Sequence, residues 1–177
     1  MKGGAKMNKN NKGFTLIELL VVIAIIGLLT TLAVVALDSA RTKSRDAKRV
    51  TDIKQVQTAL ELYFNDQDGY PDNDPLTTNP GTLGIDLTCL DGAGFGAVIG
   101  DCNGSNPPLY MGQIPADIQP YAVAGTGYIY NPTDGGVGGC ATAPCPSYEI
   151  TFFLEGNAGE LDGPGEFLAT PEGITKQ

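Results

Sequence analysis

The feature that most constrains this chain is the apolar run at residues 16–37, in which Glu18 is the only charged residue. A helix needs about 20 apolar residues to cross the hydrocarbon core of a bilayer, and this run is long enough. The residues before it contain Lys2, Lys6, Lys9 and Lys12 and no acidic residue. The pattern predicts a membrane-spanning helix whose short basic leader stays on the cytoplasmic side.

Two simpler interpretations compete with this one. A secretory signal peptide would have a shorter apolar region of about 7 to 15 residues, although Val34 and Ala36 could serve as a small-residue cleavage site. An ordinary single-span anchor explains the length and the basic flank. It gives no reason for Glu18, an acid near the edge of the apolar run.

A second apolar pattern follows without an intervening glycine or proline. Its members recur three or four residues apart and lie on one helical face: Val50, Ile53, Val56, Leu60, Tyr63 and Phe64. We therefore predict a single helix from about Phe14 to about Asn65. Asp68 and Gly69 end it, because glycine tolerates the left-handed cap, and Tyr70 precedes a proline, which disfavours helix.

The start of the apolar run carries a family resemblance. Residues 13–18 read GFTLIE and are followed by LLVVIAIIG, which resembles the class III signal peptide of type IV pilins and type II secretion pseudopilins. The resemblance implies that a membrane aspartyl peptidase, the prepilin peptidase, cleaves after Gly13 and N-methylates Phe14. It also implies that the long helices bundle into a filament core and that Glu18 pairs with the Phe14 amine of a neighbouring subunit.

The same resemblance implies an α+β pilin fold, with a long N-terminal helix and a small antiparallel sheet packed on its second half. Three parts are then expected along the chain. Residues 1–13 form the cleaved leader, residues 14–37 the transmembrane and assembly half of the helix, and residues 38–177 the globular head, including the amphipathic half of the helix.

The head has its own strand signals. Residues 121–130 and 148–154 are rich in aromatic and β-branched residues between glycine and proline punctuation, and residues 166–170 form a weaker candidate. They predict a three- or four-stranded antiparallel sheet. Residues 72–119 read mostly as loop, and residues 92–96, with three glycines, read as a flexible turn without the strand and helix that a phosphate-binding loop needs.

The four cysteines, Cys89, Cys102, Cys140 and Cys145, all lie on the side that the predicted topology places outside the cytoplasm, where disulfides persist. Three pairings are possible, and proximity in sequence favours Cys89 with Cys102 and Cys140 with Cys145. A four-cysteine zinc site is the alternative, but only the second pair has the spacing of zinc ligands.

Acidic stretches raise the question of a bound cation, since calcium prefers several oxygen ligands. Residues 65–69 do not continue with the spacing of an EF-hand. Residues 155–162 are a better candidate, and some secretion pseudopilins bind calcium in a loop near their last strands. We interpret both stretches as acidic turns and predict no metal and no cofactor.

Charge is distributed unevenly along the chain. The net charge is −9, yet residues 38–54 carry more basic than acidic residues, and Lys176 is the only basic residue after them. So acidic a head argues against direct binding of nucleic acid. The basic segment, through Arg45, Lys48 and Arg49, is predicted to attract the acidic heads of neighbouring subunits.

These observations favour a structural function. Histidine is absent, and no acid pair or nucleophile motif points to an enzyme. We predict a pilin that is inserted in the cytoplasmic membrane as a single-pass precursor and handed to the pilus assembly machinery. It would polymerise into an extracellular type IV filament, a homo-oligomer that serves adhesion, twitching motility or DNA uptake. The alternatives are a type II secretion pseudopilin and a membrane-anchored binding module that does not assemble.

Overall fold

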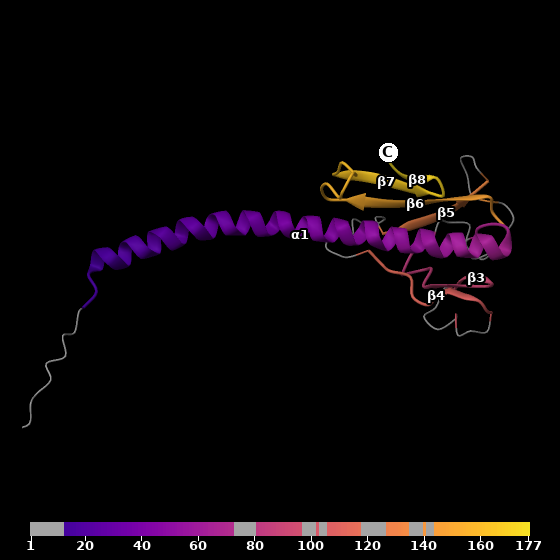
Figure 1. Cartoon of the computed structure of the whole chain (residues 1–177), viewed down its shortest axis with the longest axis horizontal. Coiled ribbons are helices and arrows are strands. Elements are labelled where there is room, and N and C mark those ends of the chain that lie inside the picture. Colours follow the sequence, from indigo (N-terminus) through magenta and orange to yellow (C-terminus); the bar gives the residue numbers. More distant parts are fainter. Residues whose placement is uncertain are drawn as a thin grey trace, which may run out of the picture. The chain divides into compact units, whose positions relative to one another are not determined.

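The computed structural model describes residues 13–72, 81–96, 102, 106–117, 127–134, 140 and 144–177 (Figure 1). The chain divides into two compact units, Met1–Ala40 and Arg41–Gln177. One α-helix is followed, within the described residues, by eight strands. Their bounds are α1 Leu16–Gln67, β1 Gly81–Thr82, β2 Cys89–Asp91, β3 Gly94–Gly96, β4 Leu109–Met111, β5 Ile129–Thr133, β6 Ser147–Leu154, β7 Gly165–Thr170 and β8 Gly173–Lys176.

Helix α1 confirms the predicted single long helix, with each end displaced by two residues, which is within the usual uncertainty of helix boundaries. Its C-terminal end differs from the prediction. The residue with left-handed backbone is Asp68, at φ 59°, and not Gly69. Aspartate tolerates this conformation, because its short polar side chain can bond locally. Gly69 is needed for another reason: a Cβ there would lie 2.3 Å from the Cβ of Pro144.

The second half of α1 buries the predicted apolar stripe. Ile53, Val56, Leu60 and Tyr63 are buried, whereas Phe64 is partly exposed. The same face also buries three charged residues that the sequence pattern did not predict: Asp46, Arg49 and Asp52.

A five-stranded antiparallel sheet packs on this part of the helix, in the order β1-β5-β6-β7-β8. Figure 1 shows β5 to β8 on one side of the helix and β3 and β4 on the other. Strand β6 alternates strictly, with every second side chain buried against the core. Its prediction at residues 148–154 is confirmed, as is that of β7 at residues 166–170.

The first predicted strand, at residues 121–130, overlaps the observed strand only at its end. Residues 121–126 lie outside the described part, residues 127–128 are not in a strand, and β5 runs from Ile129 through Pro132 to Thr133. Proline is tolerated at an edge, and β1 covers β5 only at Ile129 and Tyr130. Pro132 therefore lies where the outer side of β5 has no strand partner within the described residues.

The head core joins helix and sheet through one apolar cluster. Aromatic rings connect its parts: Tyr70 packs edge-on against Tyr148 at a centroid distance of 4.7 Å, and Phe95 against Tyr130 at 4.8 Å. Burying a large apolar side chain contributes about 1.5 to 3 kcal/mol. This cluster therefore stabilises the head more than any polar contact described below.

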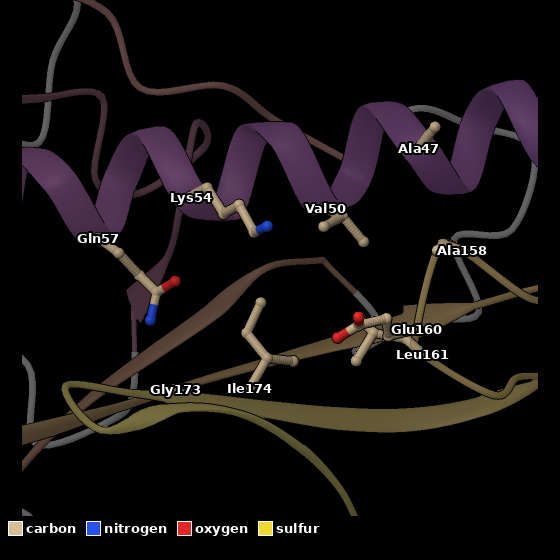
Figure 2. Close-up of a pocket in the computed structure, with 10 residues that line it drawn as sticks. Ala47, Val50, Lys54, Gln57, Ala158, Glu160, Leu161, Gly173 and Ile174 are labelled. Carbon is tan, nitrogen blue, oxygen red and sulfur yellow. The ribbon is translucent and has the colours of Figure 1, made fainter.

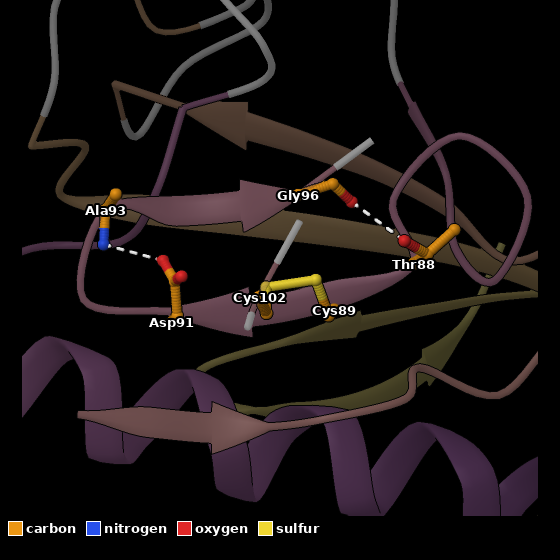
Figure 3. Close-up of a disulfide and its surroundings, with 6 residues drawn as sticks. All are labelled: Thr88, Cys89, Asp91, Ala93, Gly96 and Cys102. Atoms are coloured by element: carbon orange, nitrogen blue, oxygen red, sulfur yellow. Dashed lines mark hydrogen bonds between the residues drawn. A yellow bond between two sulfur atoms is a disulfide. The ribbon is translucent and has the colours of Figure 1, made fainter. Parts of the chain in front are cut away.

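Residues 72–119 were predicted to be mostly loop, and where the structure describes them they also contain the short strands β1 to β4. They include a three-stranded sheet in the order β3-β2-β4. The glycine-rich stretch at residues 92–96 is the turn and second strand of the β2–β3 hairpin (Figure 3). The Asp91 carboxylate accepts a hydrogen bond from the Ala93 N–H at 2.9 Å, and the Thr88 hydroxyl donates to the Gly96 carbonyl at 3.1 Å.

Candidate functional site

The N-terminal end of α1 is held by a reciprocal pair of residues. Thr15 immediately precedes Leu16, the first helical residue, and Glu18 is three positions after Thr15. A Glu18 carboxylate oxygen accepts hydrogen bonds from the Thr15 backbone N–H at 2.9 Å and from its hydroxyl at 2.6 Å. In return, Thr15 Oγ1 accepts a bond from the Glu18 N–H at 3.4 Å. This is a capping box, and it gives Glu18 a partner within its own chain.

Gly13 and Phe14 precede this cap without regular structure. The Phe14 side chain is 88% exposed. A Cβ added to Gly13 would meet no atom within 4 Å. Packing in the described structure therefore does not require glycine at position 13. Any requirement for glycine there must come from a second molecule that binds the backbone at this position.

The apolar half of α1 has no cover. Its large side chains between Leu16 and Leu37 are all exposed, and by length and composition this is the one described helix that could cross a membrane. Thr30 and Thr31 donate their hydroxyls to the carbonyls of Ile26 and Leu28, at 2.7 and 2.8 Å. Such bonds satisfy a hydroxyl in apolar surroundings. The surface is therefore suited to lipid or to other apolar helices.

The cysteines in the head form two disulfides. The structure joins Cys89 to Cys102, with 6.1 Å between the Cα atoms (Figure 3), and Cys140 to Cys145, with 5.8 Å. These are the pairs that sequence proximity favours. Disulfide sulfurs offer no thiolate, so the zinc alternative does not apply.

The second disulfide lies at the exit of α1. The backbone of Cys145 exchanges two hydrogen bonds with that of Tyr70, at 2.7 and 3.0 Å. Together with the close approach of Pro144 to Gly69, these bonds fasten the end of the helix to the segment before β6.

A buried ionic cluster fixes the other end of the head against α1. The Arg49 side chain is 1% exposed, and its guanidinium pairs with Asp46 at 2.9 Å, Asp117 at 2.8 Å and Glu155 at 2.7 Å. Arg45 also donates to Glu155, at 2.8 Å. The fully buried Asp46 carboxylate accepts the backbone N–H groups of Glu155 and Gly156, at 3.0 and 2.7 Å. The cluster thus joins the helix to the end of β6.

This geometry corrects the prediction that Arg45 and Arg49 attract neighbouring subunits, because both pair inside their own chain. Among the three basic residues named for that prediction, Lys48 is the exposed one. The error has a physical reason. Charge counted along a sequence does not reveal that a helix-borne arginine faces an acid more than 100 positions away, as Arg49 faces Glu155.

The cluster shifts the pKa values of its members. The hydrogen bond from Arg45 holds the pKa of Glu155 below its usual value, against the opposing effect of burial. Burial alone would lower the pKa of Arg49, but its three carboxylate partners raise it. Burial raises the pKa of Asp52, opposed by Lys48 and by a hydrogen bond from the Tyr128 hydroxyl at 3.3 Å. Arg49 and Glu155 therefore both stay charged at neutral pH.

The acidic stretch at residues 155–162 forms a turn closed by protein groups. The Glu155 carboxylate pairs with Arg45 and Arg49. The Asn157 amide donates to the Asp162 carboxylate at 3.0 Å, and the Lys176 ammonium donates to the Asp162 backbone carbonyl at 2.7 Å. Within the described ranges no group of three or more acidic or cysteine side chains could hold a metal ion.

Sequence reasoning located the N-terminal residues and the cysteines but missed the ionic cluster. One signal was available: Asp46 and Arg49 are three positions apart on the helical face that continues into Ile53 and Val56. Charged residues in line with an apolar stripe indicate a buried pair as readily as a solvated one.

Comparison with known proteins matches the N-terminal part of the chain. A family model described as "Prokaryotic N-terminal methylation motif" matches residues 8–34. The chain is 37% identical over 68 residues to "Type IV major pilin protein PilA" of Myxococcus xanthus (strain DK1622), which covers 38% of this chain and 31% of that protein.

Two further relatives are named "Type II secretion system core protein G". Identity is 43% over 70 residues with that of Escherichia coli (strain K12), covering 40% of this chain and 45% of the relative. It is 41% over 79 residues with that of Vibrio cholerae serotype O1, covering 42% and 53%. The matches thus span from about a third to about half of these relatives. No solved structure matches the chain significantly.

Proposed function

We propose that the chain is a member of the type IV pilin and type II secretion pseudopilin family and, within it, the structural subunit of an extracellular type IV filament. The observation that carries the proposal is the apolar half of α1, exposed along its whole length and preceded by the capping box of Thr15 and Glu18. A monomeric soluble protein rarely exposes a contiguous apolar patch larger than a few hundred Å². Such a surface calls first for a bilayer and then for other helices.

Processing of the precursor is the first step of the proposed function. The prepilin peptidase cleaves after Gly13 and methylates the new amine of Phe14. The open space around Gly13 and the exposure of Phe14 support this assignment, because a peptidase needs an accessible backbone. Intact mass of the purified subunit tests it: we expect a chain that begins at N-methylated Phe14. Assembled fibres whose subunits retain residues 1–13 would contradict it.

Assembly is the second step. The subunit waits in the cytoplasmic membrane as a single-pass protein, and the assembly machinery draws it into a homo-oligomeric filament at the cell surface. A charge among apolar helices is costly without a partner. The Phe14 amine of a neighbouring subunit, cationic near neutral pH, would supply that partner to Glu18. Residues 14–37 would form the filament core, and residues 38–177 the head around it.

A second candidate function rests on the similarity to two core proteins of type II secretion systems, which is at least as high as that to the major pilin. In that case the chain would build a secretion pseudopilus. Electron microscopy of sheared cell surfaces separates the two functions. Long filaments that contain this chain support the pilin, and their absence together with a secretion defect on deletion supports the pseudopilin.

A further inference from the structure

A groove lies between the second half of α1 and the end of the sheet at β8 (Figure 2). Its volume is about 580 Å³. Apolar side chains line it from three elements: Ala47 and Val50 from α1, Ala158 and Leu161 from the turn after β6, and Ile174 from β8. The opening is thus large enough to receive several side chains of a partner.

Two opposite charges point into this groove from its two walls. Figure 2 shows the Lys54 ammonium extending from α1 and the Glu160 carboxylate extending from the turn after β6. Neither side chain makes a hydrogen bond or ion pair with any described residue. The contrast with the nearby ionic cluster is clear, because there every arginine and every acid is paired.

The groove therefore specifies the chemistry of its occupant. The partner must bring apolar side chains, an acid for Lys54 and a base for Glu160, all within a short distance. On a helix, residues three or four positions apart are neighbours on one face. An exposed helix with two apolar residues, an acid and a base in that spacing would meet all four requirements.

Residues 34–41 have this composition. Val34, Leu37, Asp38 and Arg41 are spaced i, i+3, i+4 and i+7 on α1, and all four are exposed. Elsewhere on α1, the exposed large apolar side chains from Leu16 to Leu32 and at Leu62 and Phe64 have no lysine or arginine of the described residues within two helical turns. The same copy cannot supply the segment, because the segment and Lys54 belong to one continuous helix, α1, which does not fold back on itself.

We propose that this groove binds a second copy of the chain, through the face of α1 formed by Val34, Leu37, Asp38 and Arg41. Lys54 pairs with Asp38 of the second copy and Glu160 with its Arg41, while Val34 and Leu37 cover the apolar wall at Val50 and Ile174. The inference rests on the proposed filament and adds to it a lateral contact that fixes which part of one subunit faces which part of the next.

Charge reversal tests the contact in cells that express the variant as the sole subunit. Glu160→Lys places two cations together, and Arg41→Glu places two acids together, so each should lower the yield of sheared filaments about tenfold. The double variant Glu160→Lys/Arg41→Glu restores opposite charges and should return the yield to within about twofold of wild type. Lys43→Glu is the matched control, with the same change of charge on an exposed part of α1 outside this face, and should leave the yield unchanged.

Each other outcome has a definite meaning. Peptide mapping of both disulfides in the membrane-inserted subunit shows that a variant head has folded. Folded single variants with normal filament yield, or a double variant no better than either single one, would overturn the groove contact while leaving the filament function intact. A normal filament yield from variants whose filaments no longer attach to a surface would assign the groove to a different partner. That result would also overturn the proposed contact between two copies. If the wild-type chain forms no filament, the proposed function fails first, and the contact fails with it.

Discussion

The two halves of α1 each invert the ordinary distribution of residues, and in opposite senses. Between Leu16 and Leu37 the helix exposes its apolar side chains, and its one acid is at the start. From Asp46 onward it buries charged side chains together with apolar ones, and Arg49 is almost completely inaccessible to solvent.

The comparison teaches where each half finds its partners. The charges of the second half are matched within the chain, by Glu155, Asp117 and the backbone N–H groups after β6. The single charge of the first half, Glu18, is hydrogen-bonded only to Thr15 among the described residues. In the isolated subunit, the second half of α1 therefore already has its packing partners, whereas the exposed apolar side chains of the first half still require partners from outside the subunit.

The largest effect is expected at the single charge of the first half. Glu18→Val should leave membrane insertion and leader cleavage intact but abolish filaments or reduce them greatly, because the incoming subunit loses the group that pairs with the Phe14 amine. Filaments are counted in cells that lack the wild-type subunit. Leu19→Val, an apolar change at the next position, should assemble normally. Normal fibre numbers from Glu18→Val would show that this acid does not drive assembly.

The second half should respond to loss of its charge by unfolding. Arg49→Met leaves Asp46, Asp117 and Glu155 near one another without their shared cation, and breaking a buried pair costs about 3 to 5 kcal/mol. Urea unfolding of the detergent-solubilised chain measures the change. Lys48→Met removes an exposed charge from the neighbouring position and should stay within about 0.5 kcal/mol of wild type. Equal effects of the two variants would contradict the distinction between paired and exposed cations.

The disulfides should stabilise the head in proportion to the loops they close. In the chain-entropy model, replacing Cys89 and Cys102 by serine lowers the free energy of unfolding by about 3 kcal/mol, and replacing Cys140 and Cys145 by about 2 kcal/mol. The same unfolding experiment ranks them. A larger loss from the second pair would mean that fastening the exit of α1 at Tyr70 matters more than loop length.

The smallest effect is a dependence on pH that arises from the ionic cluster between the second half of α1 and Glu155. Because the folded pKa of Glu155 is lowered below 4.5, its contribution is complete above that pH and is lost as the pH falls through the folded value. Glu155→Gln should therefore lower the free energy of unfolding by about 2 kcal/mol at pH 7, and the difference from wild type should shrink toward zero in acid. A difference that stays constant down to pH 2 would exclude ionisation of Glu155 as its source.

The sequence predicted the extent of the helix well because its start and its apolar patterns are locally encoded. Thr15 and Glu18 cap the start, the apolar run has no break, and the stripe from Ile53 to Tyr63 keeps a helical period. Strand β6 was predictable for the same reason, since its alternation is complete within eight residues.

What the sequence did not reveal depends on partners distant along the chain. Strand β8 has four residues and exists because β7 offers its edge, and the short strands β2 to β4 likewise depend on one another. The buried charges of α1 pair with Glu155 and Asp117, which are distant along the chain. Local sequence patterns carry no information about such long-range contacts.

The aromatic cluster of the head makes the two halves of α1 optically distinct. The chain has no tryptophan, and all seven tyrosines lie at or after Tyr63. Burial raises the pKa of Tyr148 to about 12, so this phenol should ionise late in an alkaline titration. Near-ultraviolet circular dichroism and tyrosine fluorescence will therefore follow the head alone. Any spectral change that accompanies polymerisation reports a change in the head or in its immediate surroundings, because the apolar half of the helix has no tyrosine.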